Sequence, residues 1–139
     1  MSYIPTSLRQ FVTERAKGCC EYCLYPQYAS LLSFEMEHII SEKHKGETIA
    51  ANLALACPYC NRAKGTDLGS IDPVTGVLTP SFNPRTQGWI DHFCLVEACI
   101  KAFTPEGRVT VEILQFNDTR RLAERKRLIT TGMNSMPEP

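Results

Sequence analysis

Four of the seven cysteines form two matched pairs, each with two residues between the sulfurs. The first pair is Cys20 and Cys23, and the second is Cys57 and Cys60. A C-x-x-C turn lets both thiolates point to one centre, so two such turns supply four soft ligands for a tetrahedral zinc ion. The pairs are 57 − 23 − 1 = 33 residues apart. Because a simple zinc ribbon has only about 15–20 residues there, we expect a folded insert between the pairs.

Other interpretations of the cysteines stay open, namely a redox-active C-x-x-C and buried structural thiols. Two matched pairs and an odd total favour a metal site over these and over a disulfide framework. Cys19 could replace Cys20 as a ligand, although the two-residue spacing favours Cys20. Cys94 and Cys99 lie in an apolar run, and we expect them to be small core residues.

Four polar residues in and just after the insert have side chains that suit acid–base or cation chemistry: Glu37, His38, Asn52 and Asn61. Taken singly, such residues are more often structural, because strand-end histidines form hydrogen bonds and asparagines cap or turn. Their spacing relative to the cysteine pairs makes a functional role the stronger interpretation.

With this pattern the sequence resembles the HNH family of endonucleases, which share a ββα-metal active site. The resemblance covers residues 15–66, a little over a third of the chain. It runs through three segments: CEYC at 20–23, FEMEHIIS at 34–41 and NLALACPYCNRAKG at 52–65.

The resemblance implies a role for each polar residue. His38 matches the general base, a role that suits an imidazole near neutral pH. Glu37 and Asn61 match the positions that hold one divalent cation, and their oxygen donors suit Mg²⁺ or Mn²⁺. Asn52 matches the asparagine whose amide pins the loop that orients the base. The implied substrate is DNA, and the zinc ion is structural.

Four basic residues near these positions are candidate nucleic-acid contacts. Lys43 and Lys45 lie in the loop, in the stretch KHKG where relatives often show paired glycines. Arg62 and Lys64 follow Cys60 at the start of a predicted helix, where side chains and amides could meet a phosphate.

Hydrophobic periodicity predicts the elements that position these residues. A helix is predicted over 7–17, with Ser7 and Gln10 in capping-box positions and Gly18 at its end. The elements predicted next, in chain order, are a strand over 34–38, a polar loop over 41–48, a strand over 53–56 and a helix opening at 61–64 and closing near Gly65.

Beyond the insert, 72–76 and 104–107 read as turns, with residues 92–103 and 108–114 pairing as a hairpin around the second. The alternating pattern of residues 108–113 supports the strand predicted over 108–114. Asn117 or Asp118 then caps a helix to about Thr131. The basic residues of this helix are at least as consistent with a solvent-exposed face as with a phosphate-binding face.

Composition sets the class of protein. The 139 residues are 43% hydrophobic and 22% charged, with 15 basic against 15 acidic side chains, which excludes a chain disordered as a whole. No stretch reaches the about 18 consecutive apolar residues of a membrane span, and the first residues lack the layout of a secretory signal. We therefore expect a cytoplasmic protein with no membrane partner.

These observations predict the fold class α+β, with a ββα-metal HNH motif clamped by a four-cysteine zinc site and followed by a C-terminal β-hairpin and helix. We predict a single HNH nuclease domain over 1–131, with its core at 15–66 and an extension at 67–131, and a flexible tail over 132–139. The oligomeric state, monomer or homodimer, stays open.

Two alternative functions also stay open. A catalytically silent zinc-binding module could bind nucleic acid or protein on the same scaffold, although the key positions carry competent residues. A redox-responsive cysteine protein is the weaker alternative.

Overall fold

The computed structural model describes residues 2–131, and its contacts divide the chain into two compact units, Met1–Asp67 and Leu68–Pro139. The division falls one residue after the predicted motif core of 15–66, within the range predicted as one domain. The predicted tail over 132–139 lies outside the described residues.

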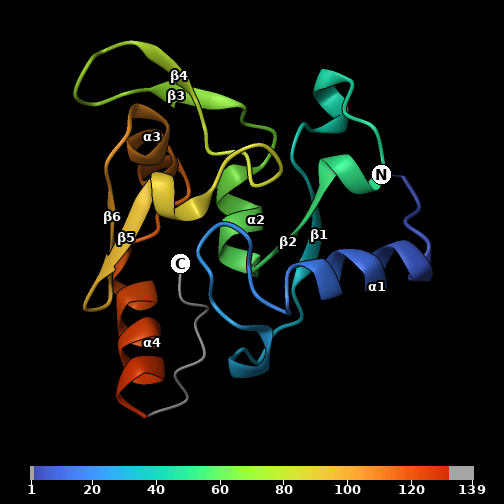
Figure 1. The fold of residues 1–139 in the computed structure, drawn as a ribbon, viewed down its shortest axis with the longest axis horizontal. Helices are drawn as coiled ribbons and strands as arrows, with labels where there is room; N and C mark the ends of the chain where they lie inside the picture. The colour runs from blue at the N-terminus through green and yellow to red at the C-terminus, as the bar shows by residue number, and fades with distance from the viewer. Residues whose placement is uncertain (1, 132–139) are drawn as a thin grey trace. The chain divides into compact units, whose positions relative to one another are not determined.

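Unit 1 holds two strands between two helices (Figure 1). Helix α1 (Thr6–Arg15) is followed by β1 (Glu35–His38), β2 (Leu53–Ala56) and α2 (Pro58–Lys64). The two strands pair in antiparallel register, with Glu35 opposite Ala56 and His38 opposite Leu53. The predicted order of strand, loop, strand and helix is confirmed.

Both helices of unit 1 begin differently from the prediction. Helix α1 begins at Thr6 with Pro5 as its N-cap and no side-chain cap, so the capping box predicted at Ser7 and Gln10 is wrong. Helix α2 begins at Pro58, three residues before the predicted opening, because proline suits the first helical position and the Cys57 side chain accepts from the Cys60 amide.

Helix α1 is anchored to β2 by the side chain of Arg15. Its guanidinium donates to the carbonyls of Ala50 at 3.0 Å and Leu53 at 2.6 Å. Val12 on the same helix is fully buried, and every residue of β2 is buried. This burial on both faces explains why β2 reads as a continuous apolar run.

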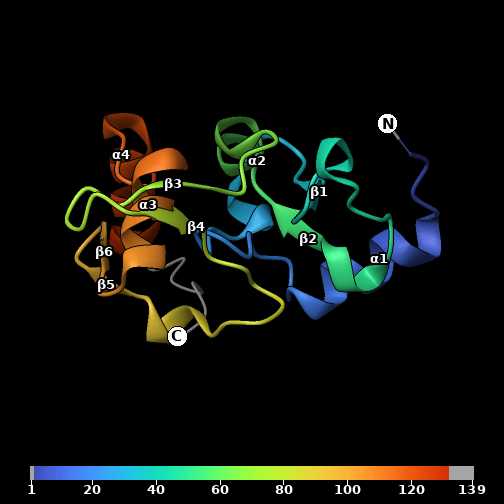
Figure 2. The same ribbon diagram turned by 90° about the horizontal axis from the view of Figure 1, so that it is seen from above.

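Unit 2 contains two hairpins and two helices, which Figure 2 shows from a second direction. The hairpins pair β3 (Gly69–Ile71) with β4 (Leu78–Pro80) and β5 (Phe93–Val96) with β6 (Cys99–Ala102). The predicted turn at 72–76 is confirmed, with Gly76 at a φ of 72°. The structure describes no helix long and apolar enough to cross a membrane over residues 2–131.

The prediction of a strand over 108–114 is wrong, because most of these residues lie in α3 (Pro105–Ile113). Thr104 is the N-cap of this helix, and its hydroxyl accepts from the Gly107 amide at 3.0 Å. The segment 104–107 is therefore a helix start rather than a turn. The hairpin instead lies wholly within 93–102.

Helix α4 (Thr119–Thr130) begins as predicted, with the Asp118 side chain capping it. Two of its arginines are buried, however, so the predicted solvated face does not include them. Arg121 donates to the Leu114 carbonyl at 2.6 Å, and Arg125 donates to the Phe116 carbonyl at 2.8 Å. These arginines hold the segment that links α3 to α4.

An ion pair ties the β3–β4 turn to α3. Arg108 Nε and Nη2 each lie 2.8 Å from a carboxylate oxygen of Asp72. Asp72 is fully buried, and the guanidinium holds the pKa of this carboxyl well below its usual range. Its carboxylate also accepts from the amides of Val74 and Thr75, which fixes the turn.

Candidate metal centre and active site

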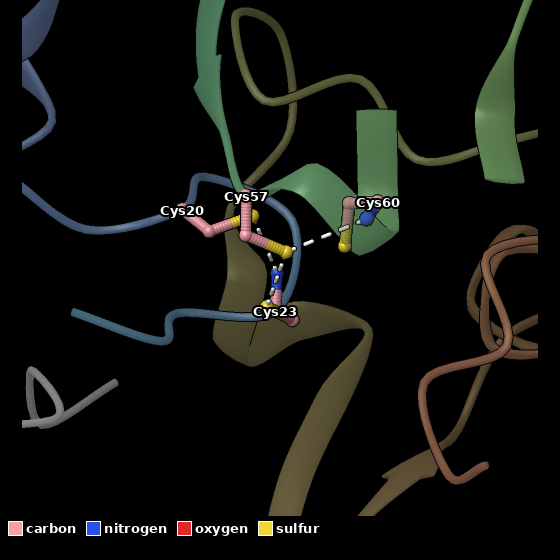
Figure 3. A group of neighbouring side chains, drawn as sticks. All are labelled: Cys20, Cys23, Cys57 and Cys60. Atoms are coloured by element: carbon pink, nitrogen blue, oxygen red, sulfur yellow. Dashed lines mark hydrogen bonds between the residues drawn. The ribbon is translucent and has the colours of Figure 1, made fainter. Parts of the chain in front are cut away.

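The four paired cysteines converge in unit 1, where Figure 3 shows their sulfurs pointing toward one another. Their Sγ atoms all lie within 4.8 Å of one another, and all four residues are buried. Cys23 Sγ lies 3.7 Å from Cys57 Sγ, close to the about 3.8 Å expected for two ligands of a tetrahedral zinc ion. The cluster can hold a metal ion such as zinc.

The two C-x-x-C turns have the same internal geometry. The Cys23 amide lies 3.5 Å from Cys20 Sγ, and the Cys60 amide lies 3.4 Å from Cys57 Sγ. Amides directed at sulfur stabilise a thiolate. Burial raises the pKa of the Cys20 and Cys60 thiols well above the ordinary value, so a bound cation is what would hold them deprotonated.

Glu21 docks the first turn onto β2. Its amide donates to the Leu55 carbonyl at 2.8 Å, and its carboxylate accepts from the Leu55 amide at 2.9 Å. The second turn directly follows β2, so both halves of the metal site are fixed by the same strand.

The remaining cysteines lie outside this cluster. Cys20, not Cys19, belongs to it, as the spacing predicts. Cys19 is buried, and its sulfur contacts the Lys17 carbonyl at 3.6 Å. Cys94 and Cys99 lie in the β5–β6 hairpin and are half-buried. They are therefore more exposed than the core residues they were predicted to be.

His38 is the last residue of β1 and is half-buried. Its Nε2 lies 2.9 Å from the Thr48 hydroxyl, at the far end of the connecting loop. If Nε2 carries the proton, Nδ1 is left with a lone pair. The contact therefore fixes the ring orientation, and in the tautomer with Nε2 as donor it leaves Nδ1 as the nitrogen that can accept a proton.

Asn52 pins the loop between β1 and β2. Its Oδ1 accepts from the Ile40 amide at 2.9 Å, and its Nδ2 donates to the carbonyls of Ile40 at 2.9 Å and Glu47 at 2.8 Å. Both ends of the loop are thus joined through one amide, the geometry that the resemblance implies for this residue.

Glu37, which the resemblance assigns to the cation, forms an ion pair with Lys64 of α2. Its Oε1 lies 2.6 Å from Lys64 Nζ, and both side chains are buried. Burial raises the pKa of the Glu37 carboxyl, and the Lys64 ammonium opposes that shift. Lys64 was predicted to contact phosphate, but its side chain is buried in the interior of unit 1.

Asn61, the other predicted cation ligand, contacts a different carboxylate of β1. Its Nδ2 donates to Glu35 Oε2. Glu35 is exposed and Asn61 is half-buried. The other candidate phosphate contacts, Lys43, Lys45 and Arg62, are all exposed.

Sequence reasoning missed Glu35, Thr48 and Glu21 as members of this region. Glu35 carried a usable signal, since residues two apart on a strand share a face and Glu37 was already a candidate. Thr48 and Glu21 carried none, because their contacts depend on the path of the loop and on the docking of the first cysteine turn.

Unit 1 thus joins a ββα unit, a four-cysteine cluster and a histidine at the end of its first strand. In agreement, residues 20–67 match the HNH endonuclease family, so the resemblance is confirmed for this part of the chain. The chain is also similar to the Septu protein PtuB of Bacillus thuringiensis, with 26% identity over 120 residues, 85% of this chain and 44% of that relative. It thus spans less than half of the relative's length. No solved structure matches it significantly.

Proposed function

We propose that this protein is a metal-dependent endonuclease that hydrolyses phosphodiester bonds in DNA, with His38 as general base. The observation that carries the proposal is the anchored imidazole of His38 within the segment that matches the HNH family. The four-cysteine cluster then holds a structural zinc ion.

The proposed mechanism assigns the proton transfer to His38. With Nε2 donating to Thr48, Nδ1 takes a proton from the attacking water. Asn52 keeps the loop that carries Thr48 in place.

A divalent cation, Mg²⁺ or Mn²⁺, would be held by Asn61 and a carboxylate of β1, which by resemblance is Glu37. When bound, it supplies charge neutralisation at the phosphate and at the leaving 3′ oxygen. Lys43, Lys45 and Arg62 are exposed and suit contacts with flanking phosphates.

The test is plasmid nicking by the zinc-loaded protein with Mg²⁺ or Mn²⁺. We expect His38→Ala to lower the rate at least about 100-fold, the usual size of a lost general base. His44→Ala is the matched control, because His44 is an exposed loop histidine outside the proposed machinery, and it should nick at the wild-type rate.

Equal nicking by wild type and His38→Ala would remove His38 as the base. DNA binding without cleavage across several divalent metals would instead support the silent zinc-binding module.

A further inference from the structure

Helix α2 and strand β1 face each other through two side-chain pairs. Glu35 and Glu37 lie two apart on β1 and share a face of the strand, while Asn61 and Lys64 lie three apart on α2 and share a face of the helix. Asn61 contacts Glu35, and Lys64 contacts Glu37. The two carboxylates are therefore in different chemical environments.

The Lys64 ammonium has three close oxygen neighbours within unit 1. Its Nζ lies 2.6 Å from Glu37 Oε1, 2.9 Å from the Ile39 carbonyl and 3.2 Å from the His38 carbonyl. The two side chains are only 3% and 6% exposed. A divalent cation on Glu37 would lie beside this buried positive charge, and like charges repel strongly where water is excluded.

The Glu35–Asn61 pair has the opposite character. The Glu35 carboxylate is exposed, and its described partner is a neutral amide. Turning the Asn61 amide about its last torsion places Oδ1 where Nδ2 now lies, so that two oxygens face one point. An exposed site also suits Mg²⁺, which keeps several of its waters.

We infer that Glu35, rather than Glu37, is the carboxylate that holds the divalent cation together with Asn61. The Glu37–Lys64 pair is then a positioning device that fixes the backbone of His38 and Ile39 against α2. This inference rests on the proposed nuclease function and names the ligand within the same site.

The test measures Mn²⁺ binding to the zinc-loaded protein by electron paramagnetic resonance, without DNA, and the Mn²⁺ concentration that gives half-maximal nicking. We expect Glu35→Gln to weaken Mn²⁺ binding at least tenfold and to raise the concentration needed for nicking by a similar factor. Glu14→Gln, which changes an exposed carboxylate on α1, is the matched control and should change neither.

Glu37→Gln should change Mn²⁺ affinity less than threefold while lowering the melting temperature, because it leaves the Lys64 charge buried without its carboxylate. If this variant does not fold, the double variant Glu37→Gln with Lys64→Met removes both charges and should bind Mn²⁺ like wild type.

A loss of affinity in Glu37→Gln or in the double variant that equals or exceeds the loss in Glu35→Gln would overturn the inference. So would unchanged affinity in Glu35→Gln, or a wild-type protein that binds no Mn²⁺. These outcomes are separate from failure of the proposed function, which the His38→Ala comparison reports, since that variant should bind Mn²⁺ normally.

Discussion

At the scale of single residues, His38 is held in place by side chains that belong to other elements of unit 1. Thr48 holds the His38 ring, and Lys64 holds the carbonyl of the same residue. In the proposed mechanism, a mobile imidazole would spend only part of its time facing the attacking water, so this anchoring would raise the population of the competent geometry.

We predict that Thr48→Val lowers kcat about tenfold with little change in KM. The substitution keeps the shape but removes the hydroxyl, and one hydrogen bond is worth about 0.5–1.5 kcal/mol. Single-turnover nicking with saturating Mg²⁺ measures the effect. Thr48→Ser, which restores the hydroxyl, should recover most of the rate, and equal rates for Val and wild type would contradict the anchoring role.

Sequence alone predicted the four-cysteine cluster, because the types and spacing of its members are local properties of the chain. The role of His38 stays a prediction that rests on the family resemblance. Sequence alone could not predict the partners of Glu35 and Glu37. Those depend on how α2 docks against β1, and a lysine in a helix is ordinarily expected to be exposed.

At the scale of elements, the backbone path of the loop between β1 and β2 depends on two neighbouring residues, Lys45 and Gly46. Lys45 has a φ of 71°, the left-handed region that favours glycine. A Cβ on Gly46 would lie 1.6 Å from the Ile40 carbonyl oxygen. Position 46 therefore has no room for a side chain on this loop path.

We predict opposite effects from substitutions at these neighbouring positions. Lys45→Gly should raise the free energy of unfolding by up to about 1 kcal/mol, because left-handed strain of about 1–2 kcal/mol exceeds the entropic cost of glycine. Gly46→Ala should lower it by at least about 2 kcal/mol through the backbone clash.

Urea titration of the zinc-loaded protein, followed by far-ultraviolet circular dichroism, measures both. Lys43→Gly is the control for Lys45→Gly. Because Lys43 lies in a short 3₁₀ helix, glycine at this position should slightly lower the free energy of unfolding. A stable Gly46→Ala protein would contradict the described loop path.

The elements of unit 1 were more predictable than those of unit 2 for a physical reason. The alternation in Arg108–Ile113 is a β pattern, yet Thr104 and Pro105 begin a helix there and Val109 and Thr110 bury one face of it. Capping and tertiary packing outweighed the preference of β-branched residues for strands.

At the scale of the whole molecule, the two units owe their stability to different interactions. Unit 1 is built around the four-cysteine cluster. Unit 2 has an aromatic core in which the Phe93 ring lies 5.4 Å from Phe82 and 5.7 Å from Phe116, together with the ion pair of Asp72 and Arg108.

We predict that removing the cysteine-bound metal unfolds unit 1 and leaves unit 2 folded. The single tryptophan, Trp89, lies in unit 2 and packs against Phe93, so its fluorescence reports on the folding of that unit. A strong chelator should reduce the circular dichroism signal and abolish nicking without shifting Trp89 emission.

Cys23→Ser should reproduce this result, because Cys23 is one of the four cysteines of the cluster. Cys94→Ser should not, because Cys94 lies outside the cluster. A simultaneous change in Trp89 emission would show that the units unfold together.

The contact between Cys23 and Cys57 also bears on how long the segment between the two cysteine pairs can be. It closes a loop over 57 − 23 − 1 = 33 residues. Closure entropy grows only with the logarithm of loop length, so doubling this segment would cost about 0.6 kcal/mol. Surface segments between the two cysteine pairs can therefore be gained or lost at a small entropic cost while the four cysteines stay together.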